Sequence, residues 1–547
     1  MKNIYNTTLL VCVLASQSVS GHNLSSNYKD NLEVKSIEDS YLLDLDSVIS
    51  IYQTTADDEF GYAMTSGDYD NDGYQDLAIG IPRYDLNVLG TVFDNTGAVL
   101  MVFGHAAGLG SETKLIFQSL DPSQDGIEEN DLFGRALTTG DFNGDGIDDL
   151  VVGVPFEDVF ELSPILNAGA VNVFYGASSG FGNSSLLIRP GLPELPSVGV
   201  EANDQFGTAL AAGDFDDDGF DDLAVGVPLE DFGIENDIDN VGAVIIYYGS
   251  DTGVDLDSMQ SVHQNSNSVL GDNEEGDLFG WSLATGYFND DDYADLAVGV
   301  PGKDIDGEFN AGLVQVFNGG NSGIGSNDYI RSQQGTVSGV LEAGDEFGNS
   351  LAAGDINNDG LDDLAIGVWK EDANASGLID IGGVNILYGD DNSLSESGSQ
   401  FISQNNSNVL GTAVNTDQFG TDVLLVDLNN DGFDDLVVGT PEDVSFDDNA
   451  IVDNAGSINI LYGNESGISL TGDEYKQSRD IDSSRNIFSQ YGRSLAAGNF
   501  NGFTAIAVGI PGWESDDGDI EAGAVDVIEF SKPDLIFKNG FSAALQF

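Results

Sequence analysis

One unit of about 72 residues repeats along most of the chain. A Phe-Gly or Tyr-Gly pair begins each unit, and the steps between successive pairs are 73, 73, 73, 68, 72 and 72 residues. The seven pairs begin at Phe60, Phe133, Phe206, Phe279, Phe347, Phe419 and Tyr491. Self-similarity at a fixed period is the sequence signature of a repeat architecture. The chain is therefore expected to fold as seven equivalent units.

Each unit has the same internal order. The aromatic-glycine pair is followed by a short strand-like segment, an acidic loop, and an apolar run that mostly ends in Gly-x-Pro. A variable acidic loop and a second apolar run beginning Gly-Ala-Val, or a close variant, come next. A weaker fourth strand precedes the next pair, as at 114–118 and 400–404. Four short strands with glycine at the turns and no helical periodicity predict the blade of a β-propeller.

We therefore predict an all-β fold, a seven-bladed β-propeller of four-stranded antiparallel blades. The propeller is expected to span residues 40–530. The seventh unit has no obvious fourth strand, whereas Asp46–Gln53 precedes the first pair as a strand without a unit of its own. We predict that this N-terminal segment completes the last blade and closes the ring, because closure removes exposed strand edges.

Five units carry an acidic loop of the form Asp-x-Asp/Asn-x-Asp-Gly-x-x-Asp between the first and second strands. Ca²⁺ takes about six to eight oxygen ligands, so several carboxylates must converge on one point. Glycine at position 6 allows the positive φ of a sharp turn around the ion. Position 7 can offer its backbone carbonyl whatever its side chain. The spacing therefore predicts a calcium cage in each of the five loops.

The predicted ligands are positions 1, 3, 5, 7 and 9 of each loop. They are Asp68, Asp70, Asp72, Tyr74 and Asp76; Asp141, Asn143, Asp145, Ile147 and Asp149; Asp214, Asp216, Asp218, Phe220 and Asp222; Asp355, Asn357, Asp359, Leu361 and Asp363; and Asp427, Asn429, Asp431, Phe433 and Asp435. An EF-hand would place a glutamate at position 12 and helices on either side, but position 12 is Ile or Val here. We expect about five Ca²⁺ ions in turns between strands.

The other two units depart from this pattern. In the fourth, Tyr287 stands at position 1 and Asp292 replaces the glycine, while Asn289, Asp291 and Asp295 remain as a weak metal site. In the seventh, residues 498–504 have lost the loop. Solvated acidic turns that bind no ion would account for one loop by chance, but not for five with the same spacing.

The N-terminus predicts export. Residues 1–20 have a basic Lys2, an apolar stretch and a small-residue exit, which is the layout of a secretory signal peptide. The single cysteine, Cys12, lies inside it, so no disulfide is expected in the mature chain. Residues 21–39 are expected to be a linker and 531–547 a C-terminal tail. No later stretch has the apolar length of a transmembrane helix. We predict a secreted, cell-surface or periplasmic protein.

The charge of the chain excludes some partners. The formal net charge is −78, from 94 acidic and 16 basic residues. Nucleic acid and anionic membranes are not expected as partners, because the sequence has no basic run and no basic amphipathic helix. The electrostatic field of so large a negative charge favours solubility and is best tolerated where salt screens it.

The units resemble the FG-GAP repeats of the integrin alpha-chain head and of related bacterial secreted proteins. The resemblance covers about residues 40–530 and rests on three motifs in each unit: the aromatic-glycine pair, the acidic loop and the Gly-Ala-Val run. It implies a seven-bladed β-propeller with calcium in the hairpin loops. In integrin-like heads the opposite face engages protein ligands, so a protein or carbohydrate ligand is expected there.

The variable loops between the second and third strands carry the candidate ligand-binding side chains. These are Tyr84, Phe156, Phe232, Trp369 and Trp513, with Phe93 and Phe160 nearby in the sequence. Exposed aromatic side chains on rigid scaffolds commonly anchor partners. The alternative is that these rings pack only against their own loops.

The sequence predicts an adhesion or ligand-binding module in which calcium braces the blades. No catalytic residue is assigned, because no carboxylate pair stands out and neither His105 nor His263 accompanies a nucleophile motif. Two alternatives stay open, an extracellular hydrolase or lyase acting on carbohydrate polymers, and a structural subunit of a surface assembly.

Overall fold

The computed structural model describes residues 35–37, 40–44 and 57–530 with internal gaps. The gaps are 89–90, 107, 111, 119–126, 161–163, 182–184, 191–200, 233–237, 265–272, 326, 332–340, 374–376, 444, 448–449, 453, 479–488 and 514–522. Three predicted segments lie outside the described residues: the signal peptide at 1–20, the strand at Asp46–Gln53 and the tail at 531–547.

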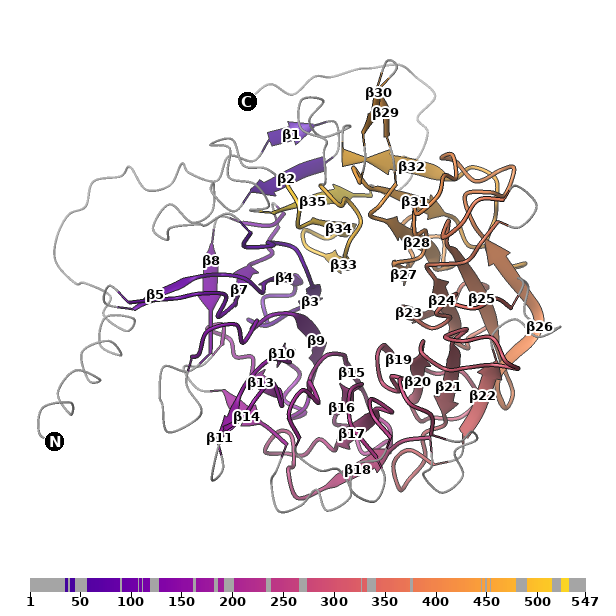
Figure 1. Ribbon diagram of the computed structural model, residues 1–547. Coiled ribbons are helices and arrows are strands. Elements are labelled where there is room, and N and C mark those ends of the chain that lie inside the picture. The colour runs from indigo at the N-terminus through magenta and orange to yellow at the C-terminus, as the bar shows by residue number, and fades with distance from the viewer. Residues whose placement is uncertain are drawn as a thin grey trace, which may run out of the picture.

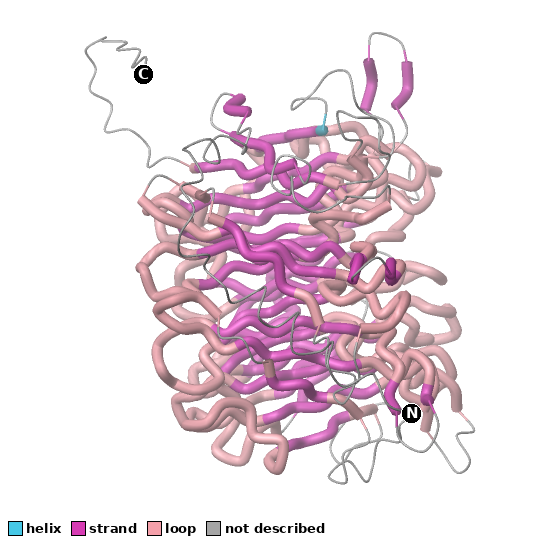
Figure 2. The backbone as a smooth tube through the Cα atoms, turned by 90° about the vertical axis from the view of Figure 1, so that its left-hand side faces the viewer, coloured by secondary structure: helices cyan, strands magenta, loops and turns pink. Residues whose placement is uncertain are grey.

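Seven antiparallel sheets form a closed ring around a central axis (Figure 1). We call the region along this axis, between the first strands of the blades, the channel. The described residues contain no α-helix. Seen from the side, the strands form the body of the ring and loops cover both of its faces (Figure 2). The predicted all-β, seven-bladed propeller is confirmed.

The first three blades each contain four strands in sequence order from the channel outward. Blade 1 has β3 (Met64–Gly67), β4 (Asp76–Ile81), β7 (Ala98–Val102) and β8 (Thr113–Ile116). Blade 2 has β9 (Ala136–Gly140), β10 (Asp149–Val154), β13 (Ala170–Phe174) and β14 (Leu186–Ile188). Blade 3 has β15 (Leu210–Gly213), β16 (Asp222–Val227), β17 (Ala243–Tyr247) and β18 (Met259–Val262).

The next three blades repeat this arrangement. Blade 4 has β19 (Leu283–Gly286), β20 (Asp295–Val300), β21 (Leu313–Phe317) and β22 (Asn327–Arg331). Blade 5 has β23 (Leu351–Gly354), β24 (Asp363–Val368), β25 (Gly383–Asp390) and β26 (Ser393–Ile402). Blade 6 has β27 (Asp422–Val426), β28 (Asp435–Thr440), β31 (Ser457–Leu461) and β32 (Glu474–Gln477).

Three short hairpins project from the connections between second and third strands. They are β5 (Leu86–Val88) with β6 (Thr91–Phe93), β11 (Val159–Phe160) with β12 (Pro164–Ile165), and β29 (Ser445–Asp447) with β30 (Ala450–Val452). They belong to blades 1, 2 and 6. These connections were expected to be loops, because their alternating patterns are too short to indicate strands in the sequence.

The hydrophobic core is divided among the seven interfaces between blades. Between blades 2 and 3, for example, Phe142, Val171 and Phe206 pack with Leu223 and Val225. The second strand of each of blades 1 to 6 is buried along its length, since a neighbouring blade covers each of its faces. This double burial explains why these strands are continuous apolar runs in the sequence rather than alternating ones.

The aromatic-glycine pair joins consecutive blades. Phe206 is 1% exposed and wedges between blades 2 and 3, where its backbone forms a β-bridge with Gly169. Gly169 has φ of +87°, and a Cβ on it would lie 2.3 Å from the carbonyl oxygen of Phe206. Only glycine fits this contact, which accounts for the first residue of the Gly-Ala-Val run.

The seventh blade has five strands, and the N-terminal segment completes it. The sheet contains β33 (Leu495–Asn499), β34 (Thr504–Ile510), β35 (Ala524–Glu529), β2 (Ser40–Asp44) and β1 (Lys35–Ile37), in this order. β2 pairs with β35 in antiparallel register, from Ser40 opposite Ile528 to Asp44 opposite Ala524. The prediction that an N-terminal strand completes the last blade and closes the ring is therefore confirmed.

The position of the closing strand differs from the prediction. It is Ser40–Asp44, not Asp46–Gln53, and β1 lies within the segment expected to be a linker. In the other six units a long connection separates the end of the fourth strand from the next aromatic-glycine pair, and Asp44 stands at a similar distance before Phe60. The chain needs this length to return from the outer edge of a blade to the channel. The distance between the fourth strand and the next aromatic-glycine pair therefore indicates the position of the closing strand.

Candidate metal centres

The five acidic loops lie in the turns between the first and second strands of blades 1, 2, 3, 5 and 6. The first strands line the channel (Figure 1), so the loops gather around one end of it. In the third loop, Gly219 at position 6 has φ of +89°, and nothing lies within 4 Å of an added Cβ. This glycine is therefore needed for its backbone conformation and not for space.

Position 4 also adopts a left-handed conformation in all five loops, a feature that the spacing alone did not predict. The residues there are Asn71, Gly144, Asp217, Asn358 and Asn430, with φ between 53° and 66°. Asn, Asp and Gly are the residue types that tolerate this region. Two left-handed residues in each loop curl the backbone so that its amides point inward.

The position 1 carboxylate is held at the centre of the curl. In the third loop, Asp214 Oδ1 accepts a hydrogen bond from the Asp218 amide at 3.1 Å, and Oδ2 accepts one from the Gly219 amide at 2.9 Å. The same two bonds recur in the other four loops at 2.8–3.1 Å. The loop thus orients its first carboxylate before any ion is considered.

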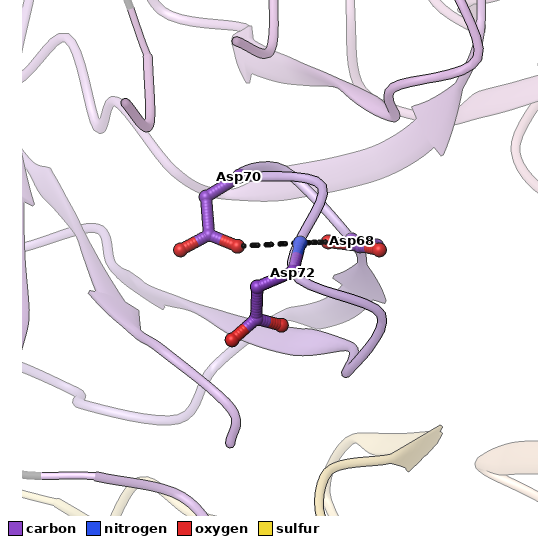
Figure 3. A group of neighbouring side chains, drawn as sticks. All are labelled: Asp68, Asp70 and Asp72. Carbon is purple, nitrogen blue, oxygen red and sulfur yellow. Dashed lines mark hydrogen bonds between the residues drawn. The ribbon is translucent and has the colours of Figure 1, made fainter. Parts of the chain in front are cut away.

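Carboxylates at positions 1, 3 and 5 converge in two of the loops. Asp68, Asp70 and Asp72 each offer an oxygen within 4.8 Å of the others, and the third loop does the same with its Asp214, Asp216 and Asp218. Figure 3 shows the first group folded around the amide of Asp72. In the remaining three loops position 3 is asparagine, whose Oδ1 replaces one carboxylate oxygen.

The position 9 carboxylate is buried beneath each loop. Asp222 is fully buried; its Oδ2 accepts the Phe215 amide at 2.9 Å and its Oδ1 accepts the Gly249 amide, at the end of the third strand, at 2.8 Å. Burial raises its pKa to about 8, the two hydrogen bonds oppose this, and Asp216 and Asp214 raise it further. The four equivalent aspartates have pKa values raised to about 7 or 8, also chiefly by burial.

Burial is the main cause of these raised pKa values, and neighbouring aspartates of the same loop raise them further. The donor set consists of carboxylate, amide and backbone oxygens, the ligands that Ca²⁺ prefers. A divalent cation would stabilise the charged form of every carboxylate in the group. The residues therefore fit a calcium ion, while ion binding itself stays a prediction.

The side chains at position 7, where backbone carbonyls were predicted as ligands, are half-buried or buried. Their amides donate to the position 5 carboxylate at 2.9–3.2 Å in all five loops. The members are Tyr74, Ile147, Phe220, Leu361 and Phe433. Three of these side chains lie beside a glycine at the end of the third strand: Ile147 beside Gly176, Phe220 beside Gly249 and Leu361 beside Gly389.

Position 8 ties neighbouring blades together, and this role was not predicted. Asp148 Oδ2 accepts the Asp68 amide of the preceding loop at 2.7 Å, and Asp221 accepts the Asp141 amide at 2.8 Å. In return, the Asp148 and Asp221 amides donate to the carbonyls of the same partners. The signal in the sequence was the pair of adjacent aspartates that ends four of the five loops. Any cation in one loop would thus be coupled to the next blade.

The two irregular units differ as expected. In the fourth, Tyr287 at position 1 is exposed and supplies no carboxylate, while Asn289 donates to Asp295 at 3.0 Å, as Asn143 donates to Asp149 at 3.3 Å in the second loop. In the seventh, Asn499 Oδ1 accepts the Gly502 amide at 2.6 Å within a shorter turn. The fourth loop retains Asp291 as its position 5 carboxylate, and the seventh has no aspartate.

Comparison with known proteins agrees with the repeat pattern. The family model described as FG-GAP repeat matches residues 60–100, 133–174, 206–247, 279–317, 347–375 and 419–457. The ring is an integrin alpha-like FG-GAP β-propeller. The family model matches six units, and the structure adds the seventh, which begins at Tyr491 and lacks the acidic loop.

The relatives of this FG-GAP propeller are longer proteins. Integrin alpha pat-2 of Caenorhabditis briggsae is 30% identical over 263 residues, 46% of this chain and 19% of the relative. Human phosphatidylinositol-glycan-specific phospholipase D is 29% identical over 226 residues, 41% of this chain and 24% of the relative. The chain thus spans about a fifth of their length. The structure of an exotype rhamnogalacturonan lyase is also similar, over 87% of this chain and 72% of the lyase, with 10% identity and a TM-score of 0.39.

The predicted ligand-binding aromatic residues of the FG-GAP propeller fall into two groups. Tyr84 and Trp513 are each 2% exposed and belong to interfaces between blades, so they are not surface anchors. Their rings pack in the same clusters as the aromatic-glycine pairs. Phe156 and Trp369 are half-buried, and Phe232 stacks on His263 with ring centroids 4.3 Å apart.

The described part of the chain contains no helix with the length and apolar character needed to cross a membrane.

Proposed function

We propose that this chain is an exported ligand-binding or adhesion module whose blades are braced by calcium. One observation carries the proposal: five loops of identical spacing hold oxygen ligands at one end of the channel, while the variable connections occupy the opposite face. The similarity to integrin alpha chains supports a ligand-binding role. The proposal requires no catalytic residue.

Calcium would act here as a structural element. Each loop joins the first and second strands of a blade. In the third loop, the position 9 aspartate also contacts the end of the third strand, and position 8 contacts the neighbouring blade. An ion that binds only the folded state stabilises it by about 2.7 kcal/mol per site at about a hundredfold excess over its Kd. In a chain without a second cysteine, this stabilisation replaces that of disulfides.

Export is proposed from the segment at 1–20, whose composition is that of a signal peptide. Calcium sites of extracellular modules commonly have modest affinity, which suits loops of this simple design. A net charge of −78 before metal binding would also be partly offset by divalent cations. The proposed export, the proposed calcium ions and the negative net charge are therefore consistent with one another.

Calcium titration tests the bracing role. Protein stripped with EGTA should bind about five Ca²⁺ ions in isothermal titration calorimetry, and its melting temperature should rise with calcium. Binding of fewer than three ions, or melting that is independent of calcium, would refute it.

Binding assays on carbohydrate and protein arrays, with calcium and with EGTA, test the ligand-binding role. The expected result is a ligand retained only with calcium. If polysaccharides are instead cleaved by the purified chain, the hydrolase or lyase hypothesis replaces this proposal.

A further inference from the structure

The end of the channel opposite the acidic loops opens into a cavity of about 400 Å³. All seven blades contribute to its wall, chiefly through the residue that follows each aromatic-glycine pair and the start of each first strand. A cavity of this volume lies within the range of ligand pockets, about 300–1,000 Å³. We call it the channel mouth.

Two arginines converge on one tyrosine in the channel mouth. The guanidinium carbon of Arg135 (blade 2) lies 4.7 Å from the ring centroid of Tyr62 (blade 1), and that of Arg493 (blade 7) lies 5.3 Å from it. Arg493 Nη2 also donates to Tyr62 Oη at 3.3 Å. Three consecutive blades thus place a pair of cations beside one ring.

Neither guanidinium forms a salt bridge with a carboxylate of the described residues. This is notable in a chain with 94 acidic and 16 basic residues. Among the described residues that line the wall, Asp422 is the only acidic one, and its oxygens accept the amides of Leu495 at 2.7 Å and Val423 at 3.1 Å. Burial raises the pKa of Asp422 to about 6, and these two hydrogen bonds and Arg493 oppose the rise. The channel mouth therefore carries two positive charges against one negative charge that is already hydrogen-bonded.

Aromatic and hydroxyl groups complete the wall. Trp281 is 38% exposed, and Trp369 is oriented by a hydrogen bond from its Nε1 to Glu346 at 2.8 Å. Thr208 and Thr421 donate their hydroxyls to backbone carbonyls at 2.8 Å, so the lone pairs of their oxygens remain as acceptors. A ligand that supplies hydrogen-bond donors and a ring face suits this wall.

We propose that the channel mouth binds the acidic sugar residue of a glycan, a uronate whose carboxylate pairs with Arg135 and Arg493. Guanidinium groups bind carboxylates with two parallel hydrogen bonds, and the sugar hydroxyls would donate to the threonine oxygens. A cavity of about 400 Å³ suits a single sugar ring at the end of a chain, whereas protein partners commonly bury broad surfaces of about 800 Å². This assignment rests on the proposed ligand-binding function and specifies its ligand class.

The tryptophans provide a direct assay. Two of the three in the chain, Trp281 and Trp369, line the channel mouth, and the third, Trp513, is buried between blades. Titration of the full chain in calcium with glucuronate, and with an oligosaccharide ending in glucuronate, should change the tryptophan fluorescence saturably. Glucose, which has the ring but not the carboxylate, should bind at least about tenfold more weakly.

Arg135→Gln and Arg493→Gln should each weaken glucuronate binding at least about tenfold, because each removes a charged hydrogen-bond partner. The matched control is Arg83→Gln, since Arg83 pairs with Glu59 at 3.3 Å and does not line the channel mouth. Each variant must melt at the wild-type temperature in calcium. A variant that fails this check is replaced by the corresponding Arg→Lys change, which keeps the charge but should still weaken binding.

Glucuronate that leaves the fluorescence unchanged, or equal binding by all three variants, would overturn the assignment. An acidic peptide that binds where glucuronate does not would also overturn it, in favour of a protein ligand. The calcium response of the melting temperature is measured in the same samples. The proposed function can therefore survive the failure of this inference, and a lack of calcium response would count against the proposed function alone.

Discussion

Asp218→Asn isolates the effect of the ion from the effect of the loop. Asp218 is at position 5 of the third loop, where its Oδ1 accepts the Phe220 amide at 3.1 Å. Asparagine keeps this acceptor and removes one negative charge. Without calcium the variant should be as stable as the wild type or slightly more so, since Asp214 and Asp216 lie within 4.8 Å and repel Asp218. With calcium it should lose one ion.

The expected magnitude follows from the size of the ring. An unfolding entropy of about 2.1 cal/mol/K per residue gives about 1 kcal/mol/K for about 490 residues. At about a hundredfold calcium excess, five sites contribute about 13 kcal/mol, so calcium should raise the melting temperature by about 13 °C. The Asp218→Asn variant should show a rise about 3 °C smaller, because one site of about 2.7 kcal/mol is missing.

Differential scanning calorimetry in calcium and in EGTA measures both quantities. The matched control is Asp291→Asn, at position 5 of the irregular fourth loop, where Asp291 is also exposed and accepts the Tyr293 amide at 3.0 Å. This control should reduce the calcium response much less than Asp218→Asn does, because the fourth loop lacks the position 1 carboxylate and the position 6 glycine. The reasoning is refuted if both variants lose the same amount, or if Asp218→Asn retains the full response.

Three further perturbations test other parts of the ring. Deleting residues 35–44 should expose the edge of β35 and produce aggregation in light scattering; a monomer with unchanged melting would contradict this. Lys303→Met should lower the free energy of unfolding by about 3–5 kcal/mol in chemical denaturation, because Lys303 lies 3.2 Å from the buried Asp277. The loss of stability should be smaller in acid than at neutral pH, since Asp277 can then take up a proton. Burial, and after it the charge of Asp131, raises the pKa of Glu157 to about 9. The contribution of Glu157 to stability is therefore present below its unfolded-state pKa and is lost as the pH rises toward 9. Glu157→Gln should abolish this pH dependence of stability, and an unchanged pH profile would contradict the argument.

Much of the fold was readable because its information is local. The period of the aromatic-glycine pairs predicted the number of blades, and the spacing within each acidic loop predicted a turn with left-handed glycine at position 6, as Gly219 shows. Both patterns describe residues that are close in sequence and repeat seven or five times. Repetition separates such a pattern from chance in a single sequence.

The apolar pattern alone indicates the wrong closing strand. Asp46–Gln53 has the stronger strand pattern, but β2 lies at the distance from Phe60 that the other blades show. Likewise, the sequence left open whether the aromatic residues of the variable loops are exposed anchors or pack within the protein, and Tyr84 and Trp513 are buried. Burial depends on the neighbouring blade, which the local sequence does not describe.

By itself, the sequence determined the seven units, their short strands and the five acidic loops with carboxylate or amide side chains at fixed positions. Only the tertiary structure decided which of these groups meet across blades. Asp148 reaches the preceding loop, and Arg493 reaches Tyr62 from the far end of the chain. The physical reason is ring closure, since it brings the last blade beside the first. Strand patterns repeat within each unit, whereas contacts between units depend on how the blades pack.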